Sequence, residues 1–281
     1  MWENELRGYA RYLAAEERSR ATVEKYIRDA GRFLVWLDGR PLSKETVIAY
    51  KERLAAMYAP ASANSMLAAV NGLLAFLGRP ECRVKTLNIQ RKVFCAQDRE
   101  LSKAEYLRLL SVANGRRRWR ISLIMQAICS TGIRVSELRS ITVEAVRRGV
   151  AQVRCKGKSR SVLLPQGLCG ILTAYIRRKK IKAGPVFVTR NGRPVDRSNV
   201  WAEMKKLCEE AGVPSSKVFP HNLRHLFART FYGVEKDLCH LADLLGHSSV
   251  DTTRIYTMTT GAEQIARLDT LGLLCPIWQS A

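Results

Sequence analysis

Residues 220–256 read PHNLRHLFARTFYGVEKDLCHLADLLGHSSVDTTRIY and contain all four histidines of the 281-residue chain. Pro220 is predicted to begin a helix, because its missing N–H would be unpaired at the first helical position. The apolar spacing over residues 238–245 predicts a second helix, and Gly246 suits the left-handed position just past its end. This stretch therefore indicates two helices followed by a tight Leu-Gly-His turn.

A third helix is expected after that turn. Either Ser248 or Ser249 suits its N-cap, since a serine hydroxyl can accept a hydrogen bond from the first helical N–H groups. Tyr256 would then lie about two turns along this helix.

Four polar side chains of this stretch form a possible chemical site. His221 and Arg224 are three residues apart and share a helix face, while His247 and Tyr256 add an imidazole and a phenol. No cluster of carboxylates surrounds them in the sequence, so the set indicates phosphoryl transfer without a metal. Of the two remaining histidines, His225 is interpreted as a packing residue or as one that supports the site residues from behind, and His240 as a helix-surface residue.

The chain carries a large excess of positive charge. Its 47 Lys and Arg outweigh 25 Asp and Glu, which gives a formal net charge of +22 at pH 7. Such an excess favours a polyanionic partner, nucleic acid before membrane, although a ribosome-associated or merely basic protein has a similar composition. The first residues do not resemble a secretory signal, and no apolar run approaches the roughly 20 residues that span a bilayer.

The eight cysteines are scattered and include no C-x-x-C pair. Most lie in apolar periodic stretches, which predicts reduced, buried thiols in a cytoplasmic protein. Neither a zinc site nor a disulfide framework is expected. The cysteines are Cys82, Cys95, Cys129, Cys155, Cys169, Cys208, Cys239 and Cys275.

Residues 6–77 show helical periodicity throughout and predict four amphipathic helices in a small bundle. Ser43 suits the N-cap of the third helix, and Gly78 and Pro80 lie in the segment that stops the fourth. We expect basic side chains on the outside of this bundle. They are Arg20, Lys25, Arg28, Lys44, Lys51 and Arg53.

The periodicity fades between residues 81 and 99, which divides the chain into two parts. We expect an N-terminal helical domain at residues 1–82 and a second domain at residues 99–281. Residues 83–98 would form a basic linker, a kind of segment that often runs along a phosphate backbone.

In the second domain, Ser102 suits a helix N-cap, and residues 121–130 form a strongly apolar helix that Gly132 ends. Arg134 follows at a bend, where it can aim its planar guanidinium at a phosphate. Glu137, three residues on, could brace that guanidinium. Taken alone, such a pair is far more commonly an ordinary surface ion pair.

Alternating polar and apolar residues from 151 onward predict a β-hairpin with its turn at Gly157. Lys156 stands just before the turn, at the end of a finger that could enter a groove, although a solvated hairpin lysine would look the same. A short strand at residues 184–188 and a helix capped by Ser198 follow. The predicted fold class is therefore mainly α with a small antiparallel β-sheet.

Taken together, these motifs resemble those of the tyrosine recombinases, the phage-integrase and Xer-like family of site-specific DNA recombinases. The resemblance covers roughly residues 100–260 in motif order and spacing, and the helical N-terminal part agrees with the family's SAM-like core-binding domain. The residues that carry it are Arg134 in TGIRVSEL, Lys156 in CKGKSR, His221 and Arg224 in PHNLRH, His247 in LGHS and Tyr256 in TTRIY.

The resemblance implies a reaction in which Tyr256 is the nucleophile and becomes joined to a DNA 3′-phosphate. Arg134 and Arg224 would clamp the non-bridging oxygens, while two histidines, His221 and His247, would hydrogen-bond the phosphate. Lys156 would be the acid for the departing 5′-oxygen, with Lys158 as the alternative lysine, because hairpin turns shift register easily. No metal and no nucleotide cofactor would be needed.

The resemblance also implies a homo-tetramer on double-stranded DNA, formed from protomers that are monomeric in free solution. Residues 262–278 are apolar and would dock onto a neighbouring protomer as an oligomerisation segment. A type IB topoisomerase, which cuts and reseals one strand, and a non-catalytic DNA-binding relative are the alternatives. Neither the target sequence nor the choice among integration, excision, dimer resolution and inversion follows from the sequence.

Overall fold

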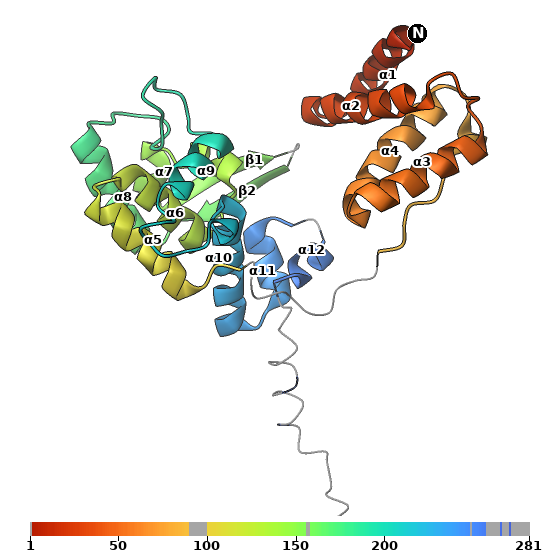
Figure 1. Ribbon diagram of the computed structural model, residues 1–281. Coiled ribbons are helices and arrows are strands. Elements are labelled where there is room, and N and C mark those ends of the chain that lie inside the picture. Colours follow the sequence, from red (N-terminus) through yellow and green to blue (C-terminus); the bar gives the residue numbers. More distant parts are fainter. Residues whose placement is uncertain are drawn as a thin grey trace, which may run out of the picture. The chain divides into compact units, whose positions relative to one another are not determined.

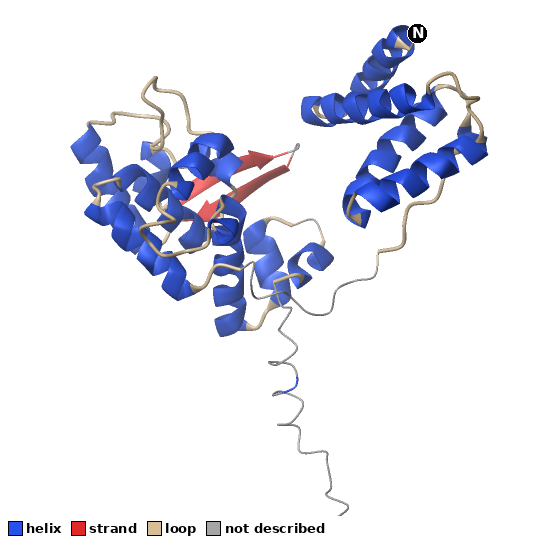
Figure 2. Ribbon diagram, in the orientation of Figure 1, coloured by secondary structure: helices blue, strands red, loops and turns tan. Residues whose placement is uncertain are grey.

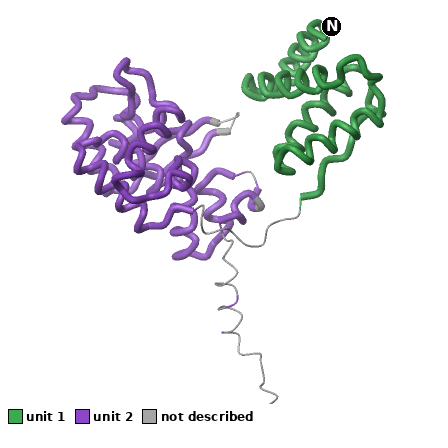
Figure 3. The backbone as a smooth tube through the Cα atoms, in the orientation of Figure 1, with its two compact units in different colours: residues 1–91 green, residues 92–281 purple. Residues whose placement is uncertain are grey.

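A computed structural model describes residues 2–89, 100–155, 158–247 and 249–256, together with residues 265 and 270. Side chains are described for these residues except Cys155, Lys158 and Asp251. The chain divides into two compact units, residues 1–91 and residues 92–281, which Figure 3 shows in different colours. Each unit has its own hydrophobic core.

Unit 1 contains the predicted helices, which are α1 (Glu3–Ala15), α2 (Arg20–Leu37), α3 (Lys44–Met57) and α4 (Pro60–Phe76), followed by the 3₁₀ turn η1 (Pro80–Cys82). Ser43 caps α3 by accepting a hydrogen bond from the backbone N–H of Thr46, as predicted. Apolar faces of the helices meet in a core that includes Tyr9, Phe33 and Leu73. Full burial of each such side chain stabilises the unit by about 1.5–3 kcal/mol.

One of the basic side chains expected on the outside of unit 1 lies partly inside it. Lys25 donates to the buried carboxylate of Asp29 at 2.6 Å and to the carbonyl oxygen of Ser65 at 3.3 Å. The expectation for Lys25 was therefore wrong. A buried carboxylate requires a cation beside it, and this one also links α2 to α4.

Unit 2 is built around α6 (Trp119–Thr131), which is labelled in Figure 1. Its Ile121, Ile124, Met125 and Ile128 are fully buried. The surrounding elements contribute to one hydrophobic core. They are α5 (Lys103–Gly115), η3 (Val135–Ser140), α7 (Val143–Arg148), α8 (Gln166–Lys179), α9 (Arg197–Lys205) and α10 (Pro220–Glu235). The short 3₁₀ turn η4 (Ser215–Lys217) precedes α10 and contributes no buried residue. Two further helices, α11 (Leu238–Leu245) and α12 (Val250–Arg254), follow α10. Leu241 and Leu245 of α11 form a smaller apolar cluster with Ala228 of α10 and with Tyr256.

The predicted hairpin is confirmed as strands β1 (Val150–Cys155) and β2 (Lys158–Leu163), which pair antiparallel (Figure 2). Its turn residues, Lys156 and Gly157, lie outside the described residues. The expected strand at residues 184–188 was wrong, because only isolated bridges form there, one of them at Pro185. Proline has no N–H to donate to a ladder of strand hydrogen bonds.

Serine N-caps were predicted for two helices of unit 2, and only one of these predictions is confirmed. Ser102 caps α5 in a capping box with Glu105, as predicted. Ser198 does not cap α9, because the helix already begins at Arg197 and Asp196 accepts the hydrogen bond from the N–H of Asn199. The partial positive charge at a helix N-terminus stabilises a carboxylate, which makes Asp196 a better cap than a serine.

The described cysteines are less uniformly buried than the sequence predicts. Cys82 and Cys208 are buried, Cys129 and Cys169 are half-buried, and Cys239 is exposed. Within the described ranges, no helix has both the length and the apolar character needed to cross a membrane.

Candidate active site

The first turn of α10 holds two of the predicted site residues. Pro220 occupies the first helical position, as predicted, and His221 follows it on an exposed surface. Arg224 lies three residues after His221, with only 2% of its surface exposed. Partial desolvation and the charges of nearby arginines lower the pKa of His221, so that this imidazole is neutral at pH 7.

Arg224 is held at the ends of two helices. Its guanidinium donates to the carbonyl oxygen of Gly132, just past α6, and at 2.8 Å to that of Leu245, the last residue of α11. Helix C-termini leave such carbonyls unpaired and favour a positive charge. Burial lowers the pKa of Arg224 to about 10, with the charge of Arg134 adding to the effect and the nearby phenol of Tyr256 opposing it. Arg224 therefore remains charged at neutral pH.

Arg134 and Glu137 form the brace that the sequence predicts. The Nη1 of Arg134 donates to the Oε1 of Glu137 at 2.9 Å, and the backbone N–H of Arg134 donates to Oε2, also at 2.9 Å. Its Nη2 donates to the carbonyl oxygen of Gly246 at 3.2 Å. These hydrogen bonds fix the guanidinium of Arg134. The side chain is still 33% exposed, so it can be reached from solvent.

Glu137 also binds an arginine that the sequence analysis missed. The Nη2 of Arg160 donates to the Oε2 of Glu137 at 2.8 Å, and its Nη1 donates to the carbonyl oxygen of Leu244, also at 2.8 Å. Burial alone would raise the pKa of Glu137, but hydrogen bonds from Arg134 and the charge of Arg160 bring it below its ordinary value. Glu137 is therefore an ionised, buried carboxylate between two guanidinium groups.

One signal in the sequence could have identified Arg160. It pairs with Val153 across the hairpin, and both Val153 and Val162, two residues further along β2, are buried. Alternate residues of a strand point to the same face. Arg160 is thus a charged residue at an inward-facing position, a pattern that indicates a buried ion pair.

His247 follows the turn after α11, as predicted. Its Nε2 lies 3.0 Å from the Nη2 of Arg224, and its Nδ1 lies 2.8 Å from the hydroxyl of the buried Thr253. Arginine can only donate, so Nε2 accepts, and the proton of the neutral ring is assigned to Nδ1. Desolvation, followed by the charges of Arg224 and Arg134, lowers the pKa of His247 to about 4.

Tyr256 lies two residues beyond the end of α12, not inside that helix as predicted. Helix α12 has only 5 residues, and the N–H of Tyr256 bonds the carbonyl oxygen of Thr253 in a turn. The ring is 3% exposed, stacks on His247 at 6.1 Å and meets the ring of His225 edge-on at 4.6 Å. His225 is a packing residue, as predicted, and its pKa is lowered to about 4 by burial and by His221.

The structure therefore brings Arg134, Arg224, His247 and Tyr256 into one cluster. His221 lies next to this cluster, because its ring centre is 4.5 Å from that of His225, which in turn contacts Tyr256. Lys156 lies outside the described residues, and only the backbone of Lys158 is described. The choice between these two lysines stays a prediction. His240 is exposed on α11, as expected for a helix-surface residue.

Gly246 ends α11 with φ +62°, and its substitution by alanine is predicted to disturb the site as well as the helix end. An added Cβ would lie 2.6 Å from the Nε of Arg160, a side chain that two hydrogen bonds hold in place. We expect Gly246→Ala to lower the free energy of unfolding by about 2–5 kcal/mol, the sum of left-handed strain and overpacking. Urea titration measures this change.

Gly149→Ala is the matched control for that experiment. Gly149 ends α7 with φ +71°, but the nearest atom to an added Cβ, the carbonyl oxygen of Leu164, is 3.9 Å away. This variant should lose only the strain contribution of about 1–2 kcal/mol. Equal losses in the two variants would show that Arg160 moves aside freely.

His247 is predicted to make the stability of unit 2 depend on pH. Its folded pKa of about 4 lies below the ordinary value of 6.5, so the unfolded chain takes up a proton first as the pH falls. The stability that this neutral histidine contributes is complete above about pH 6.5 and is lost between that pH and about 4.

The measurement compares the wild-type protein with His247→Gln in urea titrations at a series of pH values. The difference in free energy of unfolding should be largest near neutral pH and should shrink as the pH falls. His240→Gln, on the exposed side of α11, controls for the loss of a histidine elsewhere. A difference for His247→Gln that stays constant across the series would contradict the prediction.

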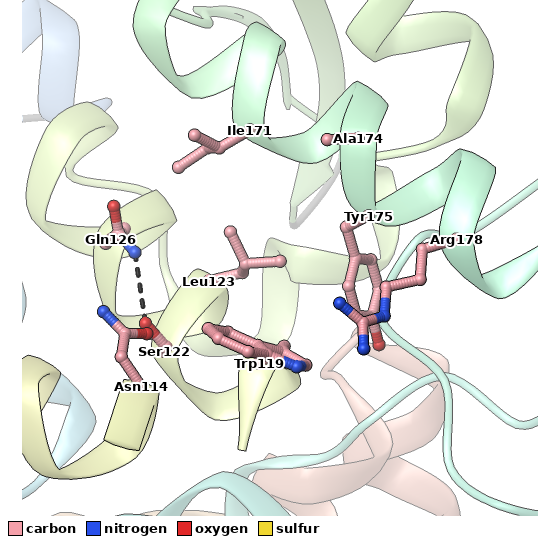
Figure 4. Close-up of a pocket in the computed structure, with 9 residues that line it drawn as sticks. All are labelled: Asn114, Trp119, Ser122, Leu123, Gln126, Ile171, Ala174, Tyr175 and Arg178. Atoms are coloured by element: carbon pink, nitrogen blue, oxygen red, sulfur yellow. Dashed lines mark hydrogen bonds between the residues drawn. The ribbon is translucent and has the colours of Figure 1, made fainter. Parts of the chain in front are cut away.

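A separate pocket of about 410 Å³ lies between α5, α6 and α8 and shares no residue with this cluster (Figure 4). Trp119, Leu123 and Ile171 line it, and the guanidinium of Arg178 lies 5.8 Å from the ring of Trp119. Its mostly apolar lining does not suit a phosphodiester. The arginine cluster is therefore the better candidate for a site of DNA chemistry.

Comparison with known sequences agrees with both parts of the chain. Residues 99–263 match the Phage integrase family, and residues 6–81 match the phage integrase N-terminal SAM-like domain. The chain is 30% identical to tyrosine recombinase XerA of Pyrococcus furiosus, over 91% of this chain and 89% of that protein. Identity to tyrosine recombinase XerD of Vibrio cholerae is 29%, over 84% of this chain and 85% of that one.

Solved structures share the fold. The post-cleavage complex of XerH site-specific recombinase with a palindromic difH substrate has a TM-score of 0.69 at 18% identity, covering 89% of this chain and 77% of that one. The crystal structure of XerA recombinase has a TM-score of 0.54 at 24% identity, covering 98% of this chain and 100% of that one. The predicted fold class is confirmed: mainly α, with a small antiparallel sheet and a SAM-like N-terminal domain.

This chain belongs to the phage integrase family, and its enzyme class is that of the tyrosine-type site-specific DNA recombinases.

Proposed function

We propose that this protein cleaves and rejoins DNA at a specific site through a covalent 3′-phosphotyrosyl intermediate. The observation that carries the proposal is the cluster in which Arg224 bonds His247 and lies close enough to Tyr256 to be affected by its phenol, with His247 stacked on the tyrosine ring. Arg134, fixed by Glu137 and partly exposed, belongs to the same cluster. A phenol beside two fixed cations is suited to attack a phosphodiester.

In this scheme the phenolic oxygen of Tyr256 forms a bond to phosphorus as the bond from phosphorus to the 5′-oxygen breaks. Arg134 and Arg224 neutralise the charge that builds up on the non-bridging oxygens. His221 and His247 are proposed to hydrogen-bond the phosphate, which for His247 requires exchange of one of its protein partners, Arg224 or Thr253. A neutral histidine is the candidate acceptor for the phenolic proton.

The departing 5′-oxygen must gain a proton, and Lys156 is its proposed donor. A lysine near other cations has a lowered pKa and gives up its proton more easily. Because the phosphotyrosyl ester replaces one phosphodiester, the 5′-hydroxyl of a second strand can attack it and restore DNA. The scheme therefore uses neither a metal nor a nucleotide cofactor.

The proposed partner is a double-stranded recombination site, bound by a tetramer of this chain. The net charge of +22 supports binding to DNA, and the solved structures that share the fold include a lambda integrase tetramer bound to a Holliday junction. In this proposal residues 1–82 bind DNA, residues 83–98 form the linker, residues 99–281 catalyse the reaction, and the protein acts in the cytoplasm. Residues 262–278, the proposed docking segment, lie outside the described residues apart from Ile265 and Thr270.

Covalent capture tests the proposal on a pool of candidate target sequences. The protein is incubated with nicked duplexes that carry a randomised central sequence, then denatured, and the DNA that stays attached is sequenced. We expect an enriched sequence whose 3′-phosphate is linked to the protein and whose capture is unaffected by a chelator. Absence of any adduct across repeated rounds, or strong inhibition by the chelator, would contradict the proposal.

The enriched duplex also separates recombination from the topoisomerase alternative. Two labelled duplexes that both carry the site should exchange strands if the protein is a recombinase. A type IB topoisomerase would cut and reseal each duplex without exchange.

A further inference from the structure

The carbonyl groups at the end of α11 are bound by three different arginines. Residues 244, 245 and 246 are consecutive, and each of their carbonyl oxygens accepts a hydrogen bond from a separate guanidinium group. The pairs are Leu244 with Arg160 at 2.8 Å, Leu245 with Arg224 at 2.8 Å, and Gly246 with Arg134 at 3.2 Å. Arg134 and Arg224 form the proposed phosphate clamp, and Arg160 binds the same stretch of backbone as these two arginines.

Arg160 also binds the carboxylate of Glu137, the group that holds Arg134. Oxygen Oε1 of Glu137 binds the Nη1 of Arg134, while Oε2 accepts from the backbone N–H of Arg134 and from the Nη2 of Arg160. Glu137 is 3% exposed, and a buried carboxylate keeps one position only while its partners are in place. Arg160 thus fixes the group that aims Arg134.

The two ends of the Arg160 fork bind different parts of the site. Nη1 holds the last turn of α11, and Nη2 holds Glu137 in η3, so both terminal nitrogens bind protein acceptors. The side chain is only 17% exposed and comes from β2, the strand that follows the turn with Lys156. Its position joins the hairpin to the cluster around Tyr256.

We propose that Arg160 is a positioning residue, which holds Glu137 and the 244–246 turn so that Arg134 and Arg224 meet the scissile phosphate in a fixed geometry. This inference rests on the proposed function. The hairpin would then contribute to cleavage in two ways, through Lys156 as proton donor and through Arg160 as positioning residue. Displacement of a reacting group by about 1 Å can slow a reaction by about 10²-fold.

The test measures the first-order rate of adduct formation at saturating DNA, with the captured duplex as substrate, alongside the DNA dissociation constant and the free energy of unfolding. Arg160→Ala should cleave about 10²-fold more slowly than the wild-type protein, while its DNA affinity stays within about threefold. Arg154→Ala is the matched control, because Arg154 is an exposed arginine on the same hairpin. It should cleave at the wild-type rate.

Arg160→Lys covers the case in which the alanine variant is poorly folded. A lysine keeps the charge and the long stem, but its single ammonium cannot reproduce the planar fork that reaches Leu244 and Glu137 together. A folded lysine variant should still cleave at least about 10-fold more slowly. Cleavage at the wild-type rate by folded Arg160→Lys would overturn the inference.

A double-mutant cycle shows whether Arg160 acts through Glu137. In a Glu137→Gln background, the further change Arg160→Ala should slow cleavage much less than it does in the wild-type background. Losses that multiply would overturn the inference, because Arg160 would then act by another route. Failure of the wild-type protein to form any adduct would instead refute the proposed function.

Discussion

Tyr256→Phe is expected to form no covalent protein–DNA adduct, while its DNA affinity stays within about twofold of the wild-type value. The substitution removes only the phenolic oxygen, the atom that would bond to phosphorus. The phenyl ring can keep its stacking on His247 and its edge-on contact with His225, so the pocket around it should persist. Denaturing gel electrophoresis of the captured duplex measures the adduct directly.

Tyr232→Phe controls for the loss of a tyrosine hydroxyl outside the cluster. Tyr232 lies on α10 with the ammonium of Lys236 5.6 Å from its ring centre, and its variant should form adduct as the wild-type protein does. Mass spectrometry of the digested wild-type adduct should assign the nucleotide to the peptide that contains Tyr256. A nucleotide found on any other residue would contradict the proposed nucleophile.

Local sequence signals were sufficient to predict much of unit 2. Pro220 and Gly246 mark helix ends because each has a backbone restriction that acts within its own turn, and α10 and α11 begin and end where these residues predict. The ion pair between Arg134 and Glu137 was also predictable, since residues three apart in a helical turn are neighbours. The order and spacing of the motifs were sufficient to identify the protein family.

Features that depend on distant partners were not predictable in this way. Arg160 binds Glu137 and Leu244, which are 23 and 84 residues away in sequence. The early end of α12 is a similar case, because Thr253 is drawn to the imidazole of His247 and Tyr256 packs against two histidines beyond the helix. Tertiary contacts of this kind outweigh local helix propensity.

Loss of Arg224 is expected to affect folding and cleavage together. Arg224→Ala leaves the carbonyls of Gly132 and Leu245 without their donor, which should cost about 1–3 kcal/mol of stability for each buried group. The same change removes one cation from the proposed phosphate clamp. A slower reaction in this variant would therefore mix two effects.

Arg224→Lys separates these effects, because an ammonium keeps the charge and can donate to one or both carbonyls, yet lacks the planar fork that also reaches His247. We expect the lysine variant to recover most of the stability but to form adduct about 10²–10³-fold more slowly than the wild-type protein. Arg229→Lys, on the same helix, changes an arginine that pairs with Glu100 outside the cluster and should alter cleavage little. A folded Arg224→Lys protein that cleaves at the wild-type rate would show that the guanidinium supports the two helix ends without contacting the reacting phosphate.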